Sequence, residues 1–191
     1  PVVIAIPTDV LEAKVEIDDV KRIKINPPLA FPEKVREVSN ILSSAKKPIL
    51  VVGGQVHIST KARELVRVVS EVHNLPVLCT YEHQDIISHN HPHYGGELGL
   101  RPPEPIRKNA LEADVVLIVG HRFNGVPNMA YKFPSIDQTF IHVLPDPNTI
   151  GKIFRTDMSI VADSKNFLEQ LSNLESKNID HERDEWVNLC N

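Results

Sequence analysis

The stretch of sequence that decides the fold is Ile49-Leu50-Val51-Val52-Gly53-Gly54. Four consecutive apolar residues predict a strand that is covered on both faces, and the two glycines predict a tight turn at its end. Ser59 or Thr60 can then cap a helix that runs to about His73, where Asn74 supplies the stop. Strand, glycine turn and helix together form the repeating unit of an α/β fold.

Similar units follow in both directions from this stretch. The apolar spacing predicts helices over 32–45, 104–113 and 165–174, and strands over 76–80, 114–120, 139–144 and 159–162. Residues 81–103 contain four histidines and many turn residues, so we expect an irregular loop there. Because parallel strands need a crossover that is usually a helix, the alternation predicts a doubly wound α/β domain. Its sheet is expected to be mostly parallel and Rossmann-like, with helices on both faces.

Composition limits the partners of the chain. Its 191 residues provide about one domain, with 41% hydrophobic and 24% charged residues, as in globular proteins. The formal net charge of −4 argues against nucleic acid and anionic membranes, because both require concentrated positive charge. No apolar run approaches the roughly 18 residues that span a bilayer. The only two cysteines, Cys79 and Cys190, are too few for a four-cysteine zinc site and suit the cytoplasm.

Candidate ligand contacts stand where the expected strands end. In open α/β sheets, ligands bind beyond the carboxyl ends of the strands, where glycines let a phosphate approach the backbone. Gly53, Gly54 and Asp146 occupy such positions, and Arg122 can either bind an anion or pair with Asp146. The strict GxGxxG fingerprint is absent, so the glycines can instead serve only to make a tight turn, which is their more frequent role.

Metal and nucleophile patterns are weak. His89, His91 and His93 alternate, so an extended backbone would place three imidazoles on one side, as a metal site can require. Pro92 interrupts this segment, and its composition is typical of a solvated loop, so we predict no metal site. Cys79 lies inside an apolar strand and is expected to be a small core residue. The chain is therefore predicted to carry no catalytic residue of its own.

Several motifs occur together in a recognisable order. They are VVIAIPTDV (2–10), AKKPILVVGG (45–54), NLPVLCT (74–80), HPHYGGELG (91–99), ADVVLIVGHRF (113–123), IHVLPDP (141–147) with IGK (150–152), and DMSIVAD (157–163). This set resembles the central domain of thiamine diphosphate-dependent enzymes, in the superfamily of acetolactate synthase and 2-oxoacid decarboxylases. The resemblance covers the chain from its start to about residue 174.

The resemblance implies a division of the chain. Residues 1–10 would be the last strand of a preceding pyrimidine-binding domain, 11–30 a linker, 31–174 the central Rossmann-like domain, and 175–191 a linker towards a diphosphate-binding domain. If this chain is isolated, the strand at 2–6 and Trp186 are expected to be exposed apolar surface. The expected partners are the other domains of the same polypeptide, within a homodimer or homotetramer.

The resemblance also implies where the chemistry lies. The cofactor-activating glutamate and the GDG-to-Asn metal motif of the family belong to the flanking domains. Thiamine diphosphate and Mg²⁺ would therefore be bound by residues outside this chain. The parent is expected to be a lyase or transferase that acts on 2-oxo acids, and this segment alone is expected to be inactive.

Some relatives hold FAD or ADP in the central domain. The matching positions here are Gly53, Gly54, Arg122, Asp146 and Ile150. FAD-binding relatives commonly read Asp-Ile-Asp-Pro where residues 144–147 read Leu-Pro-Asp-Pro, and an arginine-rich stretch is replaced by Asn-Gly-Val-Pro at 124–127. We therefore expect a vestigial pocket without FAD. The alternative function is a standalone nucleotide-binding module for ADP or FAD.

Overall fold

A six-stranded parallel sheet forms the centre of the molecule, in a computed structural model that describes residues 2–176 and 181–191. The strand order is β3-β2-β1-β4-β5-β6, and every neighbouring pair is parallel. This order reverses between β1 and β4, as in Rossmann folds. The strands are β1 (Pro48–Val52), β2 (Val77–Thr80), β3 (Tyr94–Leu98), β4 (Val115–Val119), β5 (Thr139–Leu144) and β6 (Met158–Val161).

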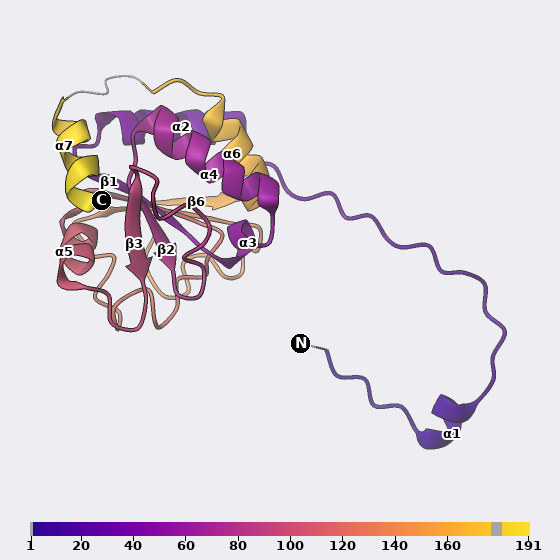
Figure 1. Cartoon of the computed structure of the whole chain (residues 1–191). Helices are drawn as coiled ribbons and strands as arrows, with labels where there is room; N and C mark the ends of the chain where they lie inside the picture. Colours follow the sequence, from indigo (N-terminus) through magenta and orange to yellow (C-terminus); the bar gives the residue numbers. More distant parts are fainter. Residues whose placement is uncertain (1, 177–180) are drawn as a thin grey trace.

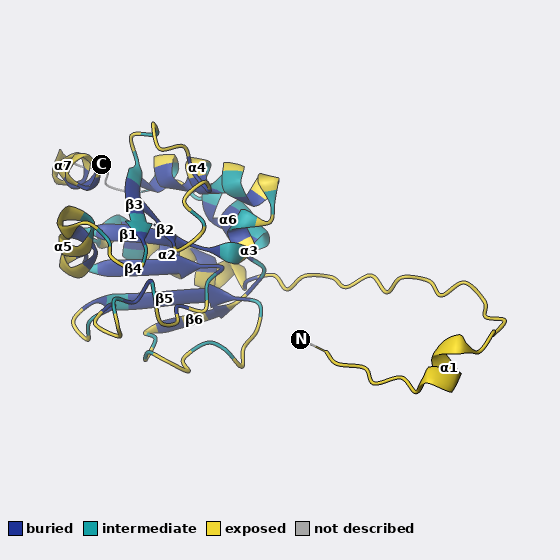
Figure 2. Cartoon of the chain, turned by 60° about the horizontal axis from the view of Figure 1, so that its bottom comes forward, coloured by how far each residue is buried: buried dark blue, intermediate teal, exposed yellow. Residues whose placement is uncertain are grey.

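Helices cover both faces of the sheet, which confirms the doubly wound fold predicted from the sequence (Figures 1 and 2). One face carries α2 (Pro32–Ser44), α3 (Gly54–His57), α4 (Thr60–His73) and α6 (Ser164–Ser172). The other carries α5 (Glu104–Glu112), α7 (His181–Cys190) and a long loop over residues 121–138. Successive residues of β1 alternate between the two cores, with Leu50 and Val52 in the first and Ile49 and Val51 in the second.

Local sequence explains the elements that were predicted. The Ser59 hydroxyl caps α4 by accepting a hydrogen bond from the Ala62 N–H at 3.3 Å, and Asn74 ends the helix in the left-handed conformation. The buried stripe of α4, which includes Val66 and Val69, then packs on the sheet. The capping residues and the apolar stripe therefore place α4 directly behind the glycine turn.

Two elements at the sheet were not predicted. β3 lies inside the segment expected to be an irregular loop, and it contains Gly95 and Gly96, which disfavour strands. The glycines are needed because a Cβ on Gly96 would lie 2.2 Å from Ile106 Cδ1, and one on Gly95 would lie 3.1 Å from Leu78 Cδ2. α3 is a four-residue helix inside the expected glycine turn. Tertiary packing, which has no local sequence signal, decides both elements.

Residues 181–190, at the end of the expected linker, form the helix α7, which packs on the domain. Trp186 was expected to be exposed but is buried, and its indole N–H donates to the Pro48 carbonyl at 2.9 Å. The Lys47 ammonium lies 5.3 Å from the centre of the same ring. The helix thus completes the second core instead of leading away from it.

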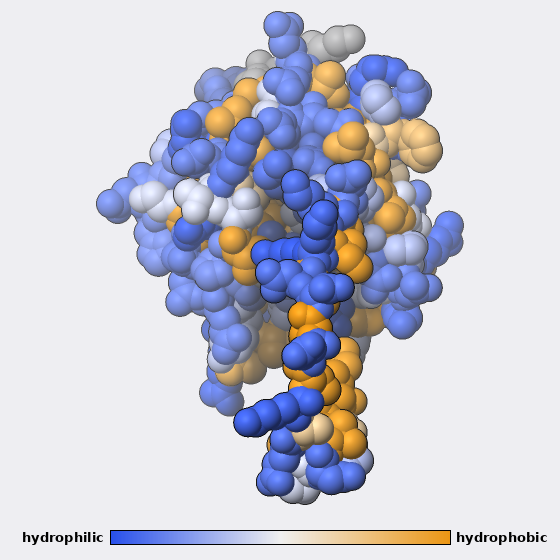
Figure 3. Space-filling view, turned by 90° about the vertical axis from the view of Figure 1, so that its right-hand side faces the viewer, coloured by the Kyte–Doolittle hydropathy of each residue, from blue (hydrophilic) through white to orange (hydrophobic). Residues whose placement is uncertain are grey.

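Residues 2–29 extend away from the domain, and all of them are exposed (Figures 1 and 2). Residues 2–7, which include the strand expected at 2–6, have no regular secondary structure in this chain. α1 (Thr8–Glu12), a five-residue helix without buried residues, spans the boundary between the expected strand segment at 1–10 and the expected linker at 11–30. Figure 3 shows apolar side chains along the segment. Among its residues, Val3 and Val20 are about nine-tenths exposed.

Candidate functional site

A pocket of about 300 Å³ opens at the carboxyl ends of the strands, beside the point where the strand order reverses. Ligands of open α/β sheets bind at this location. Its walls come from the turn after β1, the loops after β2 and β4, and the end of β5. The lining residues are Gly54, Gln55, His83, Gly120, His121, Arg122, Asn124 and Leu144.

Close packing explains the two glycines after β1. A Cβ on Gly53 would lie 2.6 Å from the His121 Cβ and 2.8 Å from the Thr80 Oγ1, closer than real side chains approach. A Cβ on Gly54 would lie 3.0 Å from the His83 Nε2. Both glycines therefore make room for side chains of this chain itself.

The backbone of this turn is also engaged within the protein. The Gly53 N–H donates to the Val119 carbonyl at 3.3 Å, and the Gln55 N–H donates to the Gly120 carbonyl at 3.0 Å. A nucleotide pyrophosphate needs such amides free at the start of a helix, and α3 has only four residues. Two amides of this turn are already hydrogen-bonded within the protein.

The other predicted contact residues are only partly brought together. Arg122 lines the pocket with Gly54 and, within the described residues, forms no ion pair with Asp146 or any other group. Asp146 and Ile150 lie outside the pocket lining, in the turn after β5. The Asp146 carboxylate accepts a hydrogen bond from the Thr149 hydroxyl at 2.6 Å and another from the Asn148 N–H at 2.9 Å. These hydrogen bonds lower the pKa of that carboxyl. Asp146 therefore stabilises the turn after β5.

A row of histidines borders the pocket, and the sequence analysis did not single it out. The ring centres of His57 and His83 are 5.3 Å apart, and those of His83 and His121 are 6.4 Å apart. His142 extends the row by donating from Nε2 to the His121 carbonyl at 2.8 Å. A sequence signal existed, because His83 and His121 each follow a strand end within three residues.

Burial determines the protonation of two histidines in this row, His121 and His142. It lowers the pKa of His121 to about 4, and His83, His142 and Arg122 add to the shift because a second positive charge is disfavoured beside them. Burial also lowers the pKa of His142, although its hydrogen bond to the His121 carbonyl opposes this change. Both rings are therefore neutral at pH 7, and Arg122 is the permanent cation among the described residues that line the pocket.

Replacing His121 with glutamine is expected to reduce the pH dependence of stability between pH 6.5 and 4. The pKa of His121 is lower in the folded state than its usual value of 6.5, so the unfolded chain binds the proton more readily. Its contribution to stability is complete above about pH 6.5 and is lost as the pH falls towards 4. Denaturant unfolding at several pH values measures this, and an NMR titration of His121 with a midpoint near 6.5 would contradict it.

The alternating histidines of the β2–β3 loop have structural partners. His89 stacks on Tyr94 with ring centres 4.6 Å apart, and the ring nitrogens of His91 and His93 lie 3.2 Å from Glu71 Oε1 and 3.0 Å from the Ser70 carbonyl. Within the described residues, no group of three histidine, cysteine or acidic side chains is arranged to hold a metal ion. Cys79 is a core residue, as predicted, and burial raises the pKa of its thiol to about 12.

The strand order and the position of the pocket define a Rossmann-like domain. In the described ranges, no helix is long and apolar enough to cross a membrane. The family model described as "Thiamine pyrophosphate enzyme, central domain" matches residues 35–171. The chain therefore belongs to this family of central domains, which confirms the resemblance found in the sequence.

The relatives are subunits of longer enzymes. A probable acetolactate synthase large subunit of Methanococcus aeolicus is 34% identical over 178 residues, which is 90% of this chain and 30% of the relative. The acetolactate synthase isozyme 3 large subunit of Escherichia coli K12 is 29% identical over 202 residues, covering 99% of this chain and 35% of that protein. The chain thus spans about a third of the length of the curated relatives it matches.

A solved structure shows the same fold. Benzoylformate decarboxylase from Polynucleobacter necessarius aligns with a TM-score of 0.67 and 22% sequence identity. The alignment covers 92% of this chain and 33% of that enzyme. The shared fold therefore extends over almost the whole of this chain and over about a third of that enzyme.

Proposed function

We propose that this chain is the central, non-catalytic domain of a longer thiamine diphosphate-dependent enzyme that acts on 2-oxo acids. The reaction is of the acetolactate synthase or decarboxylase type, and the parent is a transferase or lyase. The family match over residues 35–171 carries this proposal. The names of the relatives support it, because they include acetolactate synthase large subunits and a glyoxylate carboligase.

The described residues do not form a site for Mg²⁺. Mg²⁺ prefers oxygen ligands in octahedral arrangement, whereas the described part of the chain offers no suitable cluster of acidic side chains. We propose that thiamine diphosphate and Mg²⁺ are bound by the flanking domains. In this proposal residues 1–10 belong to a preceding pyrimidine-binding domain, and residues 11–30 link it to the central domain at 31–174. Residues 175–191, which include α7, lead towards a diphosphate-binding domain.

The exposed apolar segment at the N-terminus supports this domain organisation. Val2, Val3 and Ile4 are between 76% and 92% exposed, which is a large apolar surface for a free segment in water. Contact with a preceding domain would bury these side chains. A homodimer or homotetramer is part of the same proposal, as is the cytoplasm, where the two buried free cysteines would stay reduced.

An assay of the complete polypeptide tests the proposal. The polypeptide encoded by the full reading frame is incubated with thiamine diphosphate, Mg²⁺ and a panel of 2-oxo acids that includes pyruvate, glyoxylate and benzoylformate. We expect cofactor-dependent release of carbon dioxide from at least one of them, and none from the 191-residue chain alone. No turnover on any 2-oxo acid, combined with calorimetric binding of ADP or FAD to the chain, would favour the nucleotide-binding module instead.

A further inference from the structure

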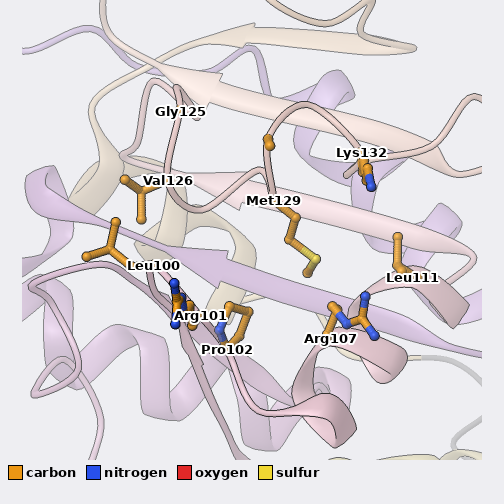
Figure 4. Close-up of a pocket in the computed structure, with 10 residues that line it drawn as sticks. Leu100, Arg101, Pro102, Arg107, Leu111, Gly125, Val126, Met129 and Lys132 are labelled. Atoms are coloured by element: carbon orange, nitrogen blue, oxygen red, sulfur yellow. The ribbon is translucent and has the colours of Figure 1, made fainter.

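A second and larger pocket lies on the face of the sheet that carries α5, between the segment after β3 and the loop after β4. It has a volume of about 440 Å³, within the range of small-molecule sites. One wall is formed by the segment from Leu100 to Leu111, and the other by the loop at 125–132. Figure 4 shows the Met129 side chain extending from this loop into the space between Leu100 and Leu111.

The interior of this pocket is apolar and open to solvent. Leu100 is 70% exposed and Leu111 is 41% exposed, although both are large aliphatic residues. Val126 and Met129 face them from the opposite wall. These side chains would gain by contact with an apolar ligand, because burial of apolar surface is worth roughly 25 cal/mol per Å².

Three cations surround this interior, and no carboxylate lines it. Arg101 and Arg107 stand on one wall and Lys132 on the other (Figure 4). Arg107 is paired with Glu104 at the pocket edge. Arg101 and Lys132 form no ion pair in the part of the chain that the structure describes. The pocket therefore presents two uncompensated positive charges beside apolar surface, in a chain whose net charge is −4.

The loop that forms the second wall is held in an unusual conformation. Met129, Ala130 and Tyr131 have φ angles of +53°, +56° and +66°, a region that non-glycine residues rarely adopt. The buried side chain of Asn128 fixes this turn, because it accepts from the Tyr131 N–H at 2.9 Å and donates to the Phe123 carbonyl at 3.2 Å. Such strained turns persist only where the surrounding structure determines them, and they concentrate at ligand sites. The wall is thus preformed.

We propose that this pocket binds a small organic anion with an aliphatic or aromatic body. The apolar walls would bury the body of the ligand, while the cations on the two walls, Arg101 and Lys132, would attract its negatively charged group. The site is separate from the pocket at the strand ends and does not depend on thiamine diphosphate. Binding to the 191-residue chain therefore tests it without any assay of turnover.

Octanoate is the test ligand, with 1-octanol and acetate as matched controls. Octanol keeps the aliphatic body without the charge, and acetate keeps the charge without the body. In amide NMR titrations of the chain, we expect octanoate to bind at least about tenfold more tightly than either control, because only octanoate uses both features. The largest shifts are expected at Gly125, Val126, Met129 and Leu111, and added salt should weaken binding.

A double variant separates this site from general charge effects. Arg101→Gln with Lys132→Gln is expected to weaken octanoate binding about tenfold and to leave octanol binding unchanged. Lys108→Gln is the control, because Lys108 lies on the same helix as Arg107 but pairs with Glu112 outside the pocket. Equal binding of octanol and octanoate, shifts confined to another surface, or self-association of the chain through this face would each overturn the proposal.

Discussion

Replacing Arg183 with methionine is expected to lower the free energy of unfolding by about 3 kcal/mol. The buried guanidinium of Arg183 donates to carbonyls at the C-terminal ends of two helices. At the end of α2 the acceptors are the carbonyls of Leu42, at 2.8 Å, and Ala45. At the end of α4 the acceptor is the His73 carbonyl, at 3.1 Å. Helix C-termini leave carbonyls without partners and carry partial negative charge. Methionine has a similar length but cannot donate, so these buried carbonyls would lose their partner.

Equilibrium unfolding in urea measures this change. Glu185→Gln is the matched control, since Glu185 lies on the same helix and is exposed, and its effect is expected to stay within about 0.5 kcal/mol. The loss of unfolding free energy in Arg183→Lys is expected to lie between the losses in Arg183→Met and Glu185→Gln, because a single ammonium cannot reach all three carbonyls. An unfolding free energy of Arg183→Met equal to that of the original chain would show that α7 is not anchored here.

Gly53→Ala is expected to destabilise the domain by about 2–3 kcal/mol. The new methyl group would lie 2.6 Å from the His121 Cβ and 2.8 Å from the Thr80 Oγ1, so the loops after β2 and β4 would have to move. The φ angle of Gly53 is −145°, which alanine adopts without strain, so the expected loss comes from the steric contact alone. Thermal or urea unfolding measures it.

Gly99→Ala is the control for this substitution. A Cβ on Gly99 would meet only the Glu97 carboxylate, at 3.4 Å or more, which is ordinary contact with a flexible side chain. We expect it to be neutral or slightly stabilising, because alanine reduces the conformational freedom of the unfolded chain. Equal losses for both variants would contradict the packing explanation of the glycine turn.

The sequence predicted the parts of the fold whose signals are local. β1 and β4 are continuous apolar runs, and α4 has both a capping serine and an apolar stripe. α7 was missed because one of its four buried positions is an arginine. Arg183, Trp186, Val187 and Cys190 follow helical spacing, but a charged residue normally indicates the solvent side. The role of Arg183 became evident only from the two helix ends that its guanidinium contacts.

The sequence pointed to the edge of the sheet where the pocket at the strand ends opens, through the glycines after β1 and the residues after β4 and β5. The neighbours of Gly53 and Gly54, however, are His83 and His121, which are far away in sequence. A turn that receives a phosphate and a turn that receives an imidazole from the same chain have the same local sequence, so only the tertiary structure separates them.

The most direct test of the central claim is a parallel calorimetric titration. Thiamine diphosphate with Mg²⁺ is added to the 191-residue chain and to the polypeptide encoded by its complete reading frame. The account predicts stoichiometric binding to the complete polypeptide and no binding to the chain alone, because the binding residues are proposed to lie in flanking domains. Saturable binding to the chain alone, or no binding to the complete polypeptide, would contradict the assignment of this chain as the central scaffold of such an enzyme.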